Sequence, residues 1–231
     1  MAIVIPGASR LHRRLRALPM LGSRLETRQL LMNAASSNPF AESFRLLALN
    51  VNAALADKAV KGVVVVSANP QDGRSVVAAN LAIALAERQG TILHDGHSRA
   101  EMPIGAMFQH HSPSTGTRDV GPSGVLPAAL AEIAQPAGGS RLWLTRERNS
   151  LPADPTRLGE ILRTASNAGL VTVVDSPPAK LSSEAFALAQ EVGQVVYVVR
   201  RVAQDMDVHR QIKEQLQRLN AQIVGLVVNE V

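Results

Sequence analysis

A polar turn that contains a glycine, a basic residue and a hydroxyl follows the most apolar run of the chain. Four valines, 63–66, precede this turn, which ends in Gly73, Arg74 and Ser75. Such a turn binds nucleotide phosphates, because backbone N–H groups and a helix N-terminus attract the anion, a cation neutralises it and the hydroxyl holds Mg²⁺. The match to the pattern G-x-x-x-x-G-K-[ST] is imperfect, since Ala68 replaces the first glycine and Arg74 the lysine. The sequence predicts a phosphate site here.

Two aspartates lie at the ends of further apolar runs. Asp175 directly follows one run, and Asp95 lies two residues past the end of another. If these runs are parallel strands, their carboxyl ends meet in the crevice that also holds the turn. Mg²⁺ favours oxygen ligands and takes one or two carboxylates beside the phosphates, so we expect Ser75 and Asp175 as its ligands and Asp95 as an assisting group. The alternative is that both aspartates only cap turns after strands.

Histidines flank Asp95, which raises the possibility of a zinc site. His94 and His97 lack the close-spaced partners of such sites, and strand alternation places residues 94 and 95 on opposite faces. We interpret them as loop histidines.

The elements that must position these residues follow an alternating order. Apolar runs alternate with helical patterns, which predicts an α/β fold with a doubly wound, mostly parallel sheet. The stretch 99–139 reads as surface loops with one helix near 126–134. We expect helices near 39–55, 75–89, 155–167, 182–191 and 204–219, and strands at 63–66, 91–93, 141–145, 170–174, 194–199 and 222–228.

Composition bounds the class of protein. The 231 residues are 46% hydrophobic and 19% charged, which is typical of a globular protein. No cysteine is present, and no apolar run reaches the roughly 20 residues that span a bilayer. We therefore expect a cytoplasmic protein. One Trp, one Tyr and four Phe offer little surface for stacking bases, so nucleic acid is not an expected partner.

The positive charge is concentrated in one segment. Residues 1–38 hold six arginines against Glu26, which equals the net charge of +5 of the whole chain. We expect residues 1–38 to form a basic, partly disordered tail and 39–231 to form one domain. Such a tail suits an anionic membrane surface or an acidic partner, and a solvated leader is an equal alternative.

From about Pro39 to Val231 the sequence resembles the bacterial tyrosine kinase (BY-kinase) family, cytoplasmic ATP-binding partners of membrane polysaccharide co-polymerases in capsule and exopolysaccharide export. The resemblance implies a P-loop NTPase fold of the deviant-Walker type. It lies in five segments: 42–45, similar to the E-x-x-R-x-x-R helix of ring oligomers; 67–81, similar to Walker A; 93–99, similar to Walker A′; 173–178, similar to the Walker B D-[TS]-P-P; and 223–231, similar to the closing V-x-G-x-V-x-N segment.

The resemblance also implies roles for individual residues. Catalysis would involve Asp95, Asp175 and Arg74, and Mg²⁺ would bind at Ser75 and Asp175. ATP or ADP would bind at Asp72, Gly73, Arg74, Ser75, Val76 and Asn229, with Asn229 near the adenine.

The sequence departs from the family pattern at positions for phosphate binding, metal binding, ring formation and tyrosine phosphorylation. Arg74 stands for lysine, His97 for the second Walker A′ aspartate, and Ala48 for the second arginine of the helix. The sequence has no C-terminal tyrosine cluster, and its one tyrosine, Tyr197, falls within an expected strand, so phosphorylation of its own tail is not expected. Two functions remain open. One is a kinase-like partner of a co-polymerase with little or no catalysis, and the other is an active kinase or ATPase that phosphorylates another chain.

Overall fold

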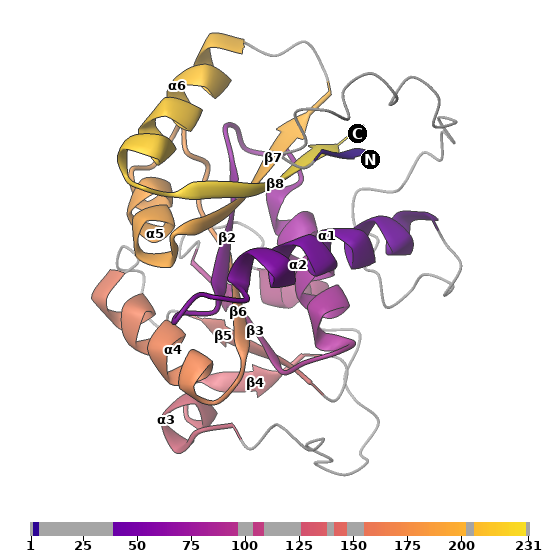
Figure 1. Ribbon diagram of the computed structural model, residues 1–231, viewed down its shortest axis with the longest axis vertical. Coiled ribbons are helices and arrows are strands. Elements are labelled where there is room, and N and C mark those ends of the chain that lie inside the picture. The colour runs from indigo at the N-terminus through magenta and orange to yellow at the C-terminus, as the bar shows by residue number, and fades with distance from the viewer. Residues whose placement is uncertain are drawn as a thin grey trace.

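Eight strands of the described residues form one sheet (Figure 1). The computed structural model describes residues 2–4, 39–96, 104–108, 126–137, 141–146, 155–201 and 206–229. The strands are β1 (Ala2–Val4), β2 (Gly62–Ser67), β3 (Thr91–Asp95), β4 (Ala134–Pro136), β5 (Leu142–Arg146), β6 (Val171–Asp175), β7 (Gln194–Arg200) and β8 (Gln222–Asn229). The helices are α1 (Pro39–Leu55), α2 (Arg74–Ala86), α3 (Ala128–Ala131), α4 (Pro155–Asn167), α5 (Glu184–Val192) and α6 (Met206–Arg218), with the 3-10 helix η3 (Ile104–Phe108).

The sheet runs in the order β1-β8-β7-β2-β6-β3-β5-β4. Its inner strands pair in parallel, and only the two outermost pairings, β1 with β8 and β4 with β5, are antiparallel. The predicted doubly wound, mostly parallel sheet is thereby confirmed.

Three short elements were not expected from the sequence. The strand β4 and the helix η3 lie in the stretch 99–139, which was interpreted as loops around one helix. The strand β1 pairs with β8, so the predicted tail 1–38 begins with three residues that join the sheet edge. Strands of three residues are too short to show an alternation pattern. Residues 5–38 lie outside the described residues, and the domain boundary at 38 stays a prediction.

Helices cover both faces of the sheet. On one face, α1 and α2 pack on the strands through a core cluster that includes Phe44, Leu47, Val77 and Leu81. On the other face, α4, α5 and α6 bury a second cluster with Leu162, Leu188 and Leu216, and α3 borders a third. Parallel strands covered on both faces must be apolar throughout, which explains the continuous valine run in β2.

Helix α2 is buried over most of its length. Every residue from Val77 to Leu85 is buried, and Asn80 satisfies its side-chain amide by donating to the carbonyl of Val76 at 3.0 Å. A fully buried leucine such as Leu81 contributes about 1.5–3 kcal/mol through removal of apolar area from water. This packing fixes the N-terminus of α2, and with it Arg74, against the ends of β2 and β6.

His94 is a buried strand residue, so its interpretation as a loop histidine is wrong. Strand β3 continues to Asp95, and His94 is 1% exposed on the sheet face opposite to Leu93. Its Nδ1 lies 2.9 Å from the Thr145 hydroxyl of β5. Burial, and secondly the charge of Arg157, lowers the pKa of His94 from its ordinary 6.5 to about 4. His97 lies outside the described residues.

His94 should make the fold sensitive to mild acid. Its folded-state pKa is depressed, so its contribution to stability is complete above pH 6.5 and is lost as the pH falls towards 4. Between pH 7.5 and pH 5.0 this group should lower the free energy of unfolding by about 2 kcal/mol. Urea denaturation of the wild type and of His94→Leu measures the difference. An identical loss in both proteins would show that another group causes the acid sensitivity.

Candidate functional site

The predicted phosphate loop connects β2 to α2 and is closed by its own polar groups. The Asp72 carboxylate, 2% exposed, accepts a hydrogen bond from the Asn69 backbone N–H at 2.9 Å. Gln71 and Gly73 adopt left-handed backbone conformations, with φ of 65° and 87°. The loop therefore holds a defined turn directly before the first residue of α2, Arg74.

Gly73 is required at its position for two reasons. Its positive φ disfavours any side chain, and the side-chain amide of Asn229 fills the space where a Cβ would stand. The same amide donates to the carbonyl of Asp72 at 3.1 Å. Asn229, expected near an adenine, thus lies at the end of β8 against the phosphate loop, and its contact with a base stays a prediction.

The strand ends bring the predicted carboxylates together. Asp95 of β3 and Asp175 of β6 are partners in the parallel register, and Asp175 in turn pairs with Val65 of β2. Alternation places both aspartates on the sheet face that α2 covers, as it does Ser67 at the end of β2. Both carboxylates are about 2% exposed or less.

Arg74 points inward, between the strand ends and its own helix. Its Nε donates to Asp175 Oδ1 at 3.0 Å, and its Nη1 donates to the Ser67 hydroxyl at 3.1 Å. The Ser67 hydroxyl in turn donates to the carbonyl of Asn69 at 3.1 Å. Arg74 is only 7% exposed, so this is a buried ion pair with a hydroxyl as second anchor.

This geometry does not fit the magnesium site that the sequence predicts. Mg²⁺ would bind at Ser75 and Asp175, but the Asp175 carboxylate already carries the Arg74 guanidinium. Among the described residues, no three acidic or histidine side chains form a group that holds a metal ion. Ser75 and Val76 are half-buried in the first turn of α2, where the backbone N–H groups have no partner within the helix. Their contact with a phosphate stays a prediction.

Sequence reasoning missed Ser67. Its hydroxyl ends the valine run, and the period of two along β2 puts it on the same face as Val65. The signal in the sequence was a hydroxyl at the end of the strand, on the face that α2 covers, followed by an arginine at the start of that helix.

Tyr197 is enclosed in the described part of the molecule. It lies in β7, 5% exposed, with its hydroxyl 2.8 Å from Nδ1 of His209 in α6. Burial, and secondly the charge of Asp72, raises the pKa of Tyr197 well above its ordinary value. A hydroxyl held in this way is a poor phosphate acceptor.

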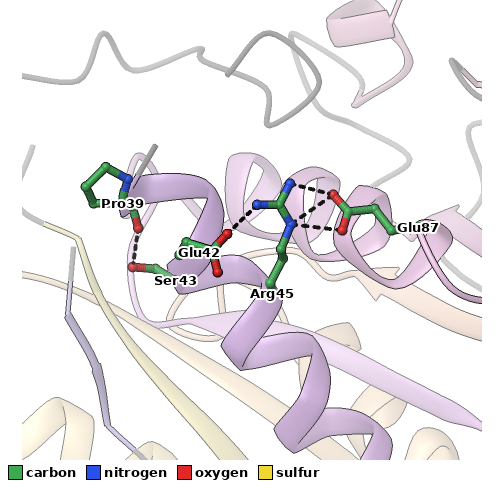
Figure 2. Close-up of polar contacts among 5 residues, drawn as sticks. All are labelled: Pro39, Glu42, Ser43, Arg45 and Glu87. Carbon is green, nitrogen blue, oxygen red and sulfur yellow. Dashed lines mark hydrogen bonds and ion pairs between the residues drawn. The ribbon is translucent and has the colours of Figure 1, made fainter. Parts of the chain in front are cut away.

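The residues that resemble an oligomerisation helix form ion pairs within the chain, as Figure 2 shows. Arg45 of α1 donates through Nε and Nη2 to Glu87, just past the end of α2, at 2.9–3.2 Å, and through Nη1 to Glu42 at 2.6 Å. These two carboxylates raise the pKa of Arg45. The Arg45–Glu87 pair joins α1 to the helix that carries the phosphate loop.

No helix among the described residues is both long and apolar enough to cross a bilayer. No protein-family model matches the sequence.

Two characterised bacterial proteins resemble the chain. The tyrosine-protein kinase YwqD of Bacillus subtilis is 24% identical, over 90% of this chain and 88% of YwqD. The succinoglycan biosynthesis transport protein ExoP of Rhizobium meliloti is 25% identical, over 95% of this chain, but the chain spans only 32% of ExoP.

A solved structure has the same fold. The kinase domain of the Escherichia coli tyrosine kinase ETK superposes with a TM-score of 0.67 over 98% of this chain and 88% of that domain, at 19% identity. The chain is thus similar in sequence to a bacterial tyrosine kinase and shares the fold of another such kinase domain.

Proposed function

We propose that the chain is a kinase-like P-loop protein of exopolysaccharide or capsule synthesis, with little or no phosphoryl transfer, that regulates a membrane polysaccharide co-polymerase. The observation that carries this proposal is the buried pair between Arg74 and Asp175. It holds the cation of the phosphate loop and the carboxylate of the metal site against each other.

Phosphoryl transfer depends on positioned charge. A cation must reach the terminal phosphates, and a carboxylate must be available to hold a metal ion beside them. In this chain Arg74 is turned away from the loop surface and towards Asp175 and Ser67. The loss of one such group from a site of this kind costs about 10³-fold in rate.

An active kinase or ATPase is the second candidate, and the register of the strand ends favours it. Asp95 and Asp175 lie side by side, and the loop keeps its turn and its glycine at 73. On this alternative ATP displaces the Arg74 guanidinium from Asp175. Asp95 then assists removal of the phenol proton of a tyrosine on another chain, whose oxygen takes the γ-phosphoryl group as ADP leaves.

A turnover assay with ATP and a tyrosine-containing copolymer distinguishes the two functions. We expect the wild type to transfer phosphate about 10³-fold or more below the roughly 1–100 s⁻¹ of kinases. Arg74→Lys supplies the compact charge of the usual loop and is expected to raise the rate. Asp175→Asn is the control for contaminating activity. A wild-type rate in the ordinary kinase range would establish the active alternative.

The proposed partner is the cytosolic segment of a co-polymerase at the inner membrane. Support comes from the name of ExoP, a transport protein of succinoglycan biosynthesis, and from the basic segment 1–38. Six arginines close together suit the anionic headgroups of the cytoplasmic leaflet. The protein then lies in the cytoplasm, peripheral to that membrane.

Removal of part of the basic segment should weaken membrane association. Because Ala2–Val4 forms β1, substitutions are preferable to deletion of residues 1–38. We expect a variant with three tail arginines changed to glutamine to bind phosphatidylglycerol vesicles about tenfold or more weakly than a control in which three arginines of the domain surface are changed to glutamine. Cosedimentation at low salt measures both, and equal losses would discard a special role for the tail. The tail variant changes Arg13, Arg14 and Arg16, and the control changes the exposed Arg163, Arg210 and Arg218.

Oligomerisation through α1 is a further part of the proposal. The helix exposes Leu46 and Leu49, 50% and 45% accessible, beside the Glu42–Arg45 pair. Apolar side chains three positions apart on an open helix face suit contact with another copy.

Light scattering after gel filtration tests this contact. The wild type should be larger than a monomer at about 100 μM, and the Leu46→Glu/Leu49→Glu double variant should be monomeric, since charges at the centre of an interface oppose association. A control changes the exposed Leu181 to Glu. Equal masses for the wild type and the double variant would contradict the role of α1.

A further inference from the structure

We infer that the guanidinium of Arg74 has taken the place of the divalent cation in this site, and that the strand ends form a latent metal site which this one side chain closes. The inference rests on the proposed function, because it treats the site as one that is no longer used for metal-dependent transfer.

The guanidinium is held by groups that a lysine could not satisfy together. Nε contacts the Asp175 carboxylate at 3.0 Å, while Nη1 contacts Ser67 at 3.1 Å. Two donors of one rigid planar group thus reach two strands at once, whereas a lysine offers a single ammonium point. Arg74 is therefore an anchored cation of the site.

A metal ion at Asp175 would compete directly with this cation. Asp175 is 1% exposed and Arg74 is 7% exposed, so water screens little of the repulsion between a divalent ion and the guanidinium. Displacement of Arg74 would also leave its charge in a buried place and break its bond to Ser67.

Without the guanidinium, the same place has the chemistry of a hard-cation site. Asp95 and Asp175 lie side by side in register on one face of the sheet, and Ser75 is the second residue of α2, next to Arg74. Two carboxylates and a hydroxyl are oxygen donors suited to Mg²⁺ or Mn²⁺. Neutral substitution of Arg74 should therefore create metal affinity.

Titration of the whole chain with Mn²⁺ alone, followed through the electron paramagnetic resonance of the free ion, tests this inference. We expect Arg74→Met to bind one Mn²⁺ at least about tenfold more tightly than the wild type, and Arg74→Met/Asp175→Asn to lose that gain. Wild-type binding as tight as that of Arg74→Met, or a gain that survives Asp175→Asn, would overturn the inference. If Arg74→Met is unstable, its melting temperature should rise with Mn²⁺ while that of the wild type does not.

A second measurement separates this inference from the proposed function. Binding of ADP to the wild type should be the same in MgCl₂ and in EDTA, and a tighter complex with MgCl₂ would overturn the inference. Phosphoryl transfer at kinase rates in the assay described above would instead overturn the proposed function.

Discussion

The buried contact between Arg74 and Asp175 determines what the centre of this molecule can do. It joins the start of α2 to the end of β6. The two meet because α2 packs on the sheet beside the carboxyl end of that parallel strand. Each charge compensates the other, so neither residue can lose its charge alone without leaving an isolated charge in the interior. Loss of one partner from such a pair typically costs about 3–5 kcal/mol. The two positions therefore form a single structural unit.

That unit need not add to stability beyond what apolar side chains of the same volume would give. Withdrawal of two charges from water largely cancels their attraction. What the pair does give is orientation. With Nη1 on Ser67 and Nε on Asp175, the guanidinium plane is fixed relative to both strands. The phosphate loop thus stands on a rigid base whose charge is already balanced.

The sequence predicted the architecture well because buried parallel strands are continuous apolar runs and the helices between them keep a clear period. Helix α4 was expected at the residues where it occurs, β2 contains the expected run 63–66, and β6 lies one residue further along the chain than the expected strand 170–174. The convergence of Asp95 and Asp175 also followed from topology. The inward direction of Arg74 did not, because it depends on a partner 101 positions away along the chain. Burial of His94 was missed for a related reason, since the strand continued two residues past its apolar pattern.

The side-chain amide of Asn229 links β8, which lies next to the outermost strand β1, to the loop between β2 and α2. It rests on Gly73 and bonds to Asp72, while β8 itself lies between β7 and β1. The end of β8 therefore packs on the loop and holds the turn at Asp72 and Gly73 in its present conformation. The conformation of the loop is in this way linked to the strands beside it: β8 contacts the loop directly through Asn229, and β1 acts on it only through its pairing with β8.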